Sequence, residues 1–185
     1  MSHDIIFAGF GGQGVQFIGT LLASAAVKEG KEVVFRPSYK GQIRGGISTC
    51  MVNISSEPIL SPVVDQYDTA VTLDQPSLEM FTPRVKPGGV LVWENSVIKK
   101  PPERPGIRMF ALPAYNQAIT VLKNKKMMNM IMFGALIAIN NEVKKESIMA
   151  ALRETLPANQ NHLIPLNEKA FDLGRNLVKM KEYEC

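Results

Sequence analysis

The feature that most constrains the fold of this chain is a short apolar run that opens directly into a turn made almost entirely of glycine. Residues 5–8 have the composition of a buried strand, and the segment at 9–14 reads GFGGQG. Gly9, Gly11 and Gly14 fit the G-x-G-x-x-G spacing of dinucleotide-binding turns. Small residues there allow a sharp strand-to-helix turn and place an anion at the positive end of the helix. The turn is therefore a candidate site for a phosphorylated ligand.

A nicotinamide-binding site would need a second feature that this chain lacks. An acidic residue is expected about 20 positions after the glycines, at the end of the second strand. The segment at 32–37, predicted as that strand, carries Arg36 near its end instead. An arginine can accept an additional phosphate, as on NADP or on the adenosine 3′-phosphate of coenzyme A. The alternative is structural: the glycines let helix and strand pack closely. The residues alone leave both interpretations open.

Length and composition indicate an ordinary globular protein, with one domain expected over residues 1–185. The net charge is only +4, and the basic residues are spread along the chain, which argues against nucleic-acid binding. Cys50 and Cys185 are too few to ligate an iron–sulfur cluster or a structural zinc, and Cys50 is expected to be a buried apolar side chain. We expect a cytoplasmic protein, since neither a signal peptide nor a membrane-length apolar run is visible.

The pattern along the chain alternates strand and helix. Strands are predicted at 32–37, 47–54, 69–73, 90–93 and 107–111, with a turn at 86–89. Helices are predicted at 13–29, 75–81, 115–122, 128–140, 145–156 and 167–182. We expect an α/β, doubly wound fold: a mainly parallel sheet with helices on both faces and a helical C-terminal portion. The methionines around residue 130 are expected to face the core, with an adaptable contact surface as the alternative.

A second glycine-rich loop follows the second strand. It carries hydroxyls, cations and glycines, and it is predicted to leave the sheet at the edge where ligands of such folds bind. Two loops at this edge can face one anionic ligand or one partner surface; a solvated surface connection is the alternative. The candidate binding residues are Gly9, Gly11, Gly12, Gln13, Gly14, Ser38, Tyr39, Arg44, Gly45 and Gly46. No catalytic residue and no metal ligand is predicted, because His3 and His162 stand far apart without accompanying ligands.

In this order, the motifs resemble the gamma subunit, or gamma domain, of the 2-oxoacid:ferredoxin oxidoreductases. The resemblance covers about the first three quarters of the chain. Its motifs are GFGGQGV at 9–15, PSY at 37–39, RGG at 44–46, LDQ at 73–75, VKPGG at 85–89, NM at 129–130 and FGAL at 133–136. Within the second loop, Lys40, Gly41 and Gln42 replace the Gly-Pro-Glu that is usual in the family, which makes this loop more cationic.

The resemblance implies a subunit of an enzyme that decarboxylates a 2-oxoacid on thiamine diphosphate, passes electrons through iron–sulfur clusters to ferredoxin and releases an acyl-coenzyme A. It implies alpha and beta partner subunits, with a delta subunit in some enzymes. These partners hold the thiamine and the clusters, so no cofactor is expected on this chain alone. The expected role is to cover the active-site cleft and contribute to the coenzyme A entry path, with 2-oxoglutarate as the favoured substrate. A stand-alone nucleotide-binding module, a small NADP-dependent reductase and an assembly protein without a ligand remain alternatives.

Overall fold

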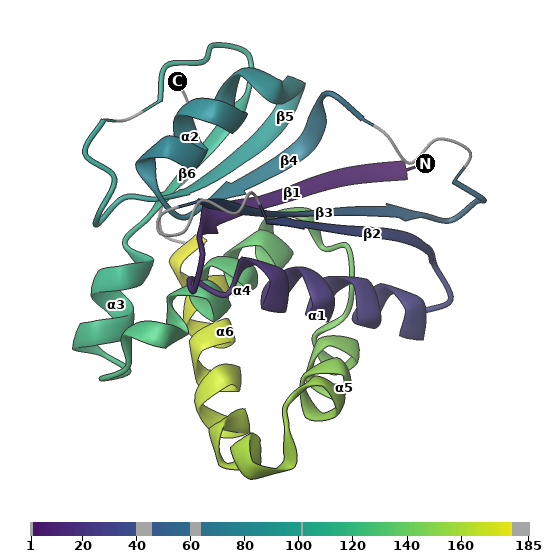
Figure 1. Ribbon diagram of the computed structural model, residues 1–185, viewed down its shortest axis with the longest axis vertical. Coiled ribbons are helices and arrows are strands. Elements are labelled where there is room, and N and C mark those ends of the chain that lie inside the picture. Colours follow the sequence, from purple (N-terminus) through teal and green to yellow (C-terminus); the bar gives the residue numbers. More distant parts are fainter. Residues whose placement is uncertain (1, 40–45, 60–63, 101, 179–185) are drawn as a thin grey trace.

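A computed structural model describes residues 2–39, 46–59, 64–100 and 102–178. Its centre is a six-stranded sheet in the order β2-β3-β1-β4-β5-β6 (Figure 1). The strands are β1 (Ser2–Phe10), β2 (Glu32–Tyr39), β3 (Ile47–Ser55), β4 (Tyr67–Thr72), β5 (Val85–Glu94) and β6 (Arg108–Leu112).

The sheet is mixed rather than wholly parallel. β1, β4, β5 and β6 pair in parallel, while β3 is antiparallel to both of its neighbours, β1 and β2. The connection from β2 to β3 contains only residues 40–46, too few for the crossover that a parallel pair requires. The prediction of a mainly parallel sheet is confirmed, with β3 as the exception. The sequence predicts a loop and no helix between these two strands, and this feature indicates an antiparallel pair.

Helices cover both faces of the sheet, as predicted, but unequally (Figure 1). One face carries α1 (Val15–Lys28), α4 (Met128–Asn140), α5 (Lys145–Thr155) and α6 (Ile164–Val178), and the other carries α2 (Gln75–Phe81). α3 (Ala114–Thr120) follows β6 at the edge where the parallel strands end. The short 3-10 helices are η1 (Thr82–Arg84), η2 (Lys125–Met127) and η3 (Ala158–Leu163).

The larger core lies between the sheet and the four helices α1, α4, α5 and α6. α4 is its centre, and its methionines are buried, which confirms the core interpretation. α4 and α6 cross closely because Gly134 faces the backbone of Phe171 and Gly174 faces the backbone of Ile131, so a side chain at either glycine would collide with a helix backbone. α1 approaches β3 through Gly19, where a Cβ would collide with the side chain of Cys50.

Two predicted segments differ most from the structure, while several other bounds differ by one or two residues. The segment at 86–89 is not a turn between elements, because it stays within β5 as an irregularity. There β5 advances from Val85 to Val90 while β4 advances only from Tyr67 to Thr69. The last helix, α6, begins at Ile164 rather than at 167, directly after η3.

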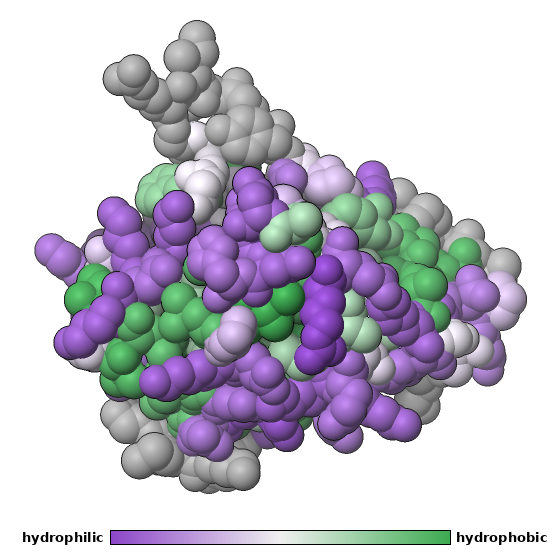
Figure 2. All heavy atoms as spheres, turned by 90° about the horizontal axis from the view of Figure 1, so that it is seen from below, coloured by the Kyte–Doolittle hydropathy of each residue, from purple (hydrophilic) through white to green (hydrophobic). Residues whose placement is uncertain are grey.

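The surface at the helical end is mostly hydrophilic. Figure 2 shows charged and polar side chains with smaller hydrophobic areas between them. Ion pairs join the helices here: Lys28 with Glu154, and Lys145 with both Glu168 and Asp172. Within the described ranges, no helix is long and apolar enough to cross a membrane.

Candidate functional site

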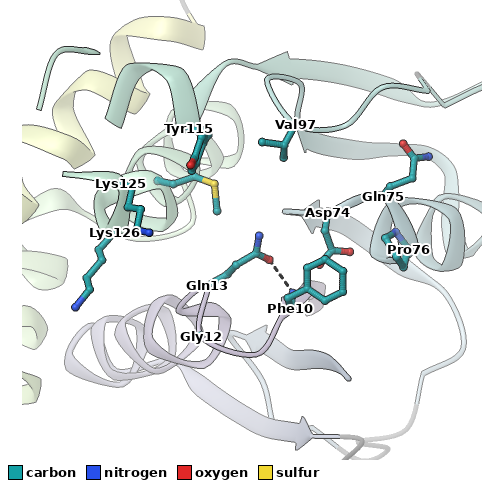
Figure 3. A pocket seen from close by; sticks show the side chains of 11 residues that line it. Phe10, Gly12, Gln13, Asp74, Gln75, Pro76, Val97, Tyr115, Lys125 and Lys126 are labelled. Carbon is teal, nitrogen blue, oxygen red and sulfur yellow. Dashed lines mark hydrogen bonds between the residues drawn. The ribbon is translucent and has the colours of Figure 1, made fainter. Parts of the chain in front are cut away.

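The glycine turn joins β1 to α1 and is fastened to the neighbouring strand by Gln13. Gln13 Oε1 accepts a hydrogen bond from Phe10 N at 2.7 Å, and Nε2 donates to the Leu73 carbonyl at 3.3 Å (Figure 3). Gly12 and Gly14 have φ values of 93° and 78°, a conformation in which glycine is favoured. The turn is therefore held rigidly between the carboxyl ends of β1 and β4.

The glycines serve different purposes. A Cβ at Gly9 would lie 2.5 Å from Gln13 Oε1, and one at Gly14 would collide with the amide of Asn129 at the start of α4. These two positions support the packing interpretation. A Cβ at Gly12, in contrast, would meet no atom within 4 Å. Gly11 and Gly12 are exposed, and the N-cap residue of α1, Gly14, makes no side-chain cap hydrogen bond, so the first backbone N–H groups of α1 lack a partner within the helix.

A cavity of about 660 Å³ lies beside this turn, at the carboxyl ends of β1, β4 and β5. In doubly wound sheets this is the crevice where ligands bind, since the helices that follow β1 and β4 cover opposite faces. We call it the turn cavity. Its lining residues are Phe10, Gly12, Gln13, Asp74, Gln75, Pro76, Val97, Tyr115, Lys125, Lys126 and Met128 (Figure 3).

Asp74 is the N-cap of α2, with its Oδ1 accepting from Ser77 N at 2.8 Å. Its side chain is buried, and Oδ2 has no hydrogen-bond partner within the described part of the chain. A buried carboxylate oxygen without a partner is unusual in a folded protein. This enclosed oxygen, unpartnered within the described chain, belongs to a residue that lines the turn cavity.

Glu94, at the end of β5, organises the opposite wall. This buried carboxylate accepts hydrogen bonds from the backbone N–H groups of Ser96, Val97 and Tyr115, at 3.1, 2.8 and 3.0 Å. It therefore fixes the positions of Val97 and Tyr115, which line the turn cavity. Sequence reasoning missed Glu94, Tyr115 and Lys125, because only the fold brings these distant segments to the turn.

The second predicted loop lies near the first but contributes to a different cavity. Ser48 of β3 is paired with Tyr39 on one side and with Gly9 on the other, so one strand separates the two segments. Ser38 and Gly46 line a neighbouring cavity of about 760 Å³, which shares Phe10 and Pro76 with the turn cavity. The two predicted segments thus reach one edge of the sheet, at adjacent cavities.

Arg44 and Gly45, both predicted as binding residues, lie outside the described residues, as do Lys40, Gly41 and Gln42.

Cys50 is fully buried in the core, which confirms its predicted apolar role. Burial raises the pKa of its thiol to about 12, so it is not a reactive thiolate at neutral pH. Cys185 lies outside the described residues. Across the described ranges, no group of three or more His, Cys, Asp or Glu side chains is placed to hold a metal ion.

Comparison with known proteins gives consistent matches. The family described as "Pyruvate ferredoxin/flavodoxin oxidoreductase" matches residues 4–177. The chain is 34% identical over 168 residues to ketoisovalerate oxidoreductase subunit VorA of Methanothermobacter thermautotrophicus, covering 90% of this chain and 34% of that protein. It is also 34% identical over 182 residues to 2-oxoglutarate synthase subunit KorC of Methanocaldococcus jannaschii, covering 97% of this chain and 95% of that protein.

A crystal structure of the gamma subunit of a keto/oxoacid ferredoxin oxidoreductase from Geobacter sulfurreducens PCA superimposes with a TM-score of 0.86 at 30% identity, covering 99% of each chain. The chain thus spans about a third of the length of VorA but nearly the whole of KorC and of the Geobacter subunit. The family resemblance predicted from the motifs is confirmed.

Proposed function

Because the chain belongs to the pyruvate ferredoxin/flavodoxin oxidoreductase family, we propose that it is the gamma subunit of a 2-oxoacid:ferredoxin oxidoreductase. Its partners are the subunits that carry thiamine diphosphate and the iron–sulfur clusters, and ferredoxin is the electron acceptor of the complex. The thiamine supplies the decarboxylation chemistry and the clusters the electron path. This chain supplies the turn cavity at the carboxyl edge of its sheet.

The observation that carries the proposal is the turn cavity beside the exposed glycines and the N-terminus of α1. We infer that the glycine turn, with Gly11, Gly12 and the N-terminus of α1, binds a phosphate of coenzyme A during acyl transfer. Backbone N–H groups at an uncapped helix N-terminus favour such an anion, and Lys125 at the cavity rim adds positive charge. Ser38, Tyr39, Arg44, Gly45 and Gly46 are proposed to contact the same ligand or a partner subunit.

We propose 2-oxoglutarate as the substrate. The support is the match to KorC, a 2-oxoglutarate synthase subunit, along nearly the whole length of both chains. Ketoisovalerate is the competing substrate, since VorA is equally similar in identity.

Purification of the tagged chain from its own host, followed by an assay of coenzyme A-dependent viologen reduction with a panel of 2-oxoacids, tests the subunit role. Larger thiamine and iron–sulfur subunits should co-purify, and 2-oxoglutarate should give the highest rate. A chain that emerges alone and inactive from a gentle preparation would contradict the role. A faster rate with ketoisovalerate would overturn only the substrate.

A matched pair of variants at Gly12 tests the coenzyme A contact in the assembled enzyme. Asn and Asp tolerate left-handed backbone similarly, and position 12 has room for either side chain. Gly12→Asp adds a negative charge beside the proposed phosphate, whereas Gly12→Asn does not. The KM for coenzyme A should be about tenfold higher in the Asp variant than in the Asn variant at low salt. Equal KM values would place coenzyme A elsewhere.

A further inference from the structure

The cavity next to the turn cavity has features that the proposed function does not use. α2 packs against β1 and β4, and beside it the same face of β2, β3 and β1 borders a cavity of about 760 Å³. β2 alternates across the sheet: Val33 packs in the core beneath α1, and Val34 packs on the α2 face. Arg36 and Ser38 follow Val34 at two-residue steps and line this cavity. We call it the arginine cavity.

Two arginines from separate segments line it. Arg36 comes from β2, and Arg84 ends η1 after α2. The Arg84 guanidinium lies 5.6 Å from the centre of the Phe81 ring, and that ring makes an edge-to-face contact with Tyr67 at 6.0 Å. A cation–π contact uses the face of a guanidinium, so its in-plane N–H donors stay available. Arg84 is thus positioned without losing its capacity to bind an oxyanion.

The charges around Tyr67 indicate that the cavity is electropositive. Burial raises the pKa of Tyr67, and the charges of Arg84 and Arg36 oppose that rise, so both cations act on the same phenol. The carboxylates of Asp65 and Asp4 act on this phenol in the opposite sense. The effect of Asp65 ranks between those of Arg84 and Arg36. Asp4 is bound by Lys86, and Asp65 does not line the cavity. Among the described residues that line the cavity, the charged side chains are those of Arg36 and Arg84.

The remaining wall is apolar. Ile6, Met51 and Phe81 line the cavity and belong to the core cluster under α2. Clefts of this size with an apolar wall and a few convergent polar groups are typical of small-molecule sites. We propose that the arginine cavity binds a small organic anion, with its phosphate or carboxylate between Arg36 and Arg84 and its apolar body against Ile6, Met51 and Phe81.

The test uses the full chain and isothermal titration with defined probes. Phenyl phosphate and phenylacetate carry an anionic head on an apolar body, inorganic phosphate supplies the head alone, and benzyl alcohol supplies the body without charge. Phenyl phosphate or phenylacetate should bind saturably, and the tighter of the two identifies the head group. Inorganic phosphate and benzyl alcohol should each bind at least about tenfold more weakly, since each can make only part of the contacts.

Arg84→Gln and Arg36→Gln remove one charge each from the cavity, and Arg153→Gln removes one from an exposed position on α5, on the opposite face of the sheet. Each cavity variant should raise the Kd of the tighter probe by about tenfold, as expected for a charge-assisted hydrogen bond. The Arg153 variant should change it by less than about twofold. Circular dichroism of all three variants checks that the fold is retained.

Three results would overturn the proposal. Equal loss in all three variants would mean non-specific attraction to a cationic protein. Amide NMR shifts confined to Gly11–Gly14, with none at Thr49 or Tyr67, would place the probe on the glycine turn. Absence of saturable binding below about 10 mM, an affinity weaker than about −3 kcal/mol, would exclude a small-anion site. If Arg84→Gln then also weakened co-purification of partner subunits, the cavity would instead hold an acidic segment of a partner.

Discussion

At the amino ends of the parallel strands, charged side chains pair with one another, whereas at the carboxyl ends several polar groups have no partner in the described chain. Lys86 Nζ lies 2.9 Å from the carboxylates of both Asp4 and Asp68, and Asn53 donates to Asp4 at 2.6 Å. At the carboxyl ends, buried oxygens of Thr72, Asp74 and Ser77 lack partners among the described residues.

The two edges differ in how their buried carboxylates are satisfied. Buried polar groups in a folded chain are normally satisfied. At the amino edge Lys86 is paired with its two carboxylates, although Asn53 Oδ1 and Arg104 Nε lack partners among the described residues. The carboxyl edge also exposes Phe10 and Val97, at 38% and 43% of their surface. The amino edge thus pairs its buried carboxylate within the chain, and we infer that the carboxyl edge is completed by a ligand or by another subunit.

Among the variants that test this contrast, the largest loss of stability is expected for a substitution of Lys86. Lys86→Met keeps much of the side-chain volume but leaves Asp4, which is 5% exposed, without its cation. The free energy of unfolding should fall by about 3 kcal/mol, the lower end of the range for a broken buried pair, because Lys86 is partly exposed. Urea unfolding measures this. Lys99→Met, the same change at an exposed position after β5, should cost less than about 0.5 kcal/mol. Similar losses for both variants would remove the distinction between the edges.

A second amino-edge network should show a smaller effect. Thr69 Oγ1, fully buried, accepts a hydrogen bond from Asn140 Nδ2 at 2.9 Å and lies 3.0 Å from His3 Nε2. His3 is also paired with Glu142. Thr69→Val leaves the Asn140 and His3 groups without this partner, so stability should fall by about 1–2 kcal/mol in urea unfolding. A neutral result would mean that solvent satisfies both groups.

Stability should also depend on alkaline pH through Lys86, an effect smaller than loss of the side chain because neutral Nζ still donates hydrogen bonds. Burial lowers the Lys86 pKa, but hydrogen bonds and charge from Asp68 and Asp4 outweigh it, so the folded pKa is raised above the ordinary value of 10.5. This contribution is fully present below 10.5 and is lost as pH rises through the folded pKa.

Lys145 has a raised pKa as well, so the wild-type curve alone does not isolate Lys86. Lys86 is isolated by comparing how the free energy of unfolding depends on pH in wild type and in Lys86→Met. The loss of stability above pH 10.5 should be shallower in the variant. Identical slopes in the two proteins would assign the whole effect to other groups.

Much of the fold was predictable because local signals agreed with tertiary packing. The boundaries of α2 and α4 match their predictions, since Pro76 lies in the first turn of one helix and a mainly apolar run forms the other. The segment at 86–89 was mispredicted because proline and glycine usually mark turns, and here they form an irregularity within β5.

The sequence allowed prediction only of the part of the site that is formed by adjacent residues. The glycine turn is visible in the sequence because its conformational demands fall on adjacent residues. Tyr115, Lys125 and the carboxylate of Glu94 reach the same cavity from distant segments, and no spacing rule links them. His3 is a further case: its partners, Thr69 and Glu142, are far from it in sequence.

The smallest stability effect is expected at the carboxyl edge, and it separates binding from folding there. Asp74→Asn retains an oxygen that can accept from Ser77 N, and Asn and Asp are similarly good N-caps. The change removes the charge of a buried carboxylate whose Oδ2 has no described partner, so urea unfolding should shift by less than about 0.5 kcal/mol.

Asp74→Ala, which removes the cap, should cost about 1 kcal/mol. In the assembled enzyme, Asp74→Asn should nevertheless lower subunit affinity or raise the KM for coenzyme A, because the carboxylate is expected to meet its donor only there. If stability falls as far in the Asn variant as in Lys86→Met while assembly and KM stay unchanged, Asp74 is a structural group. The carboxyl edge would then be as complete in the single chain as the amino edge.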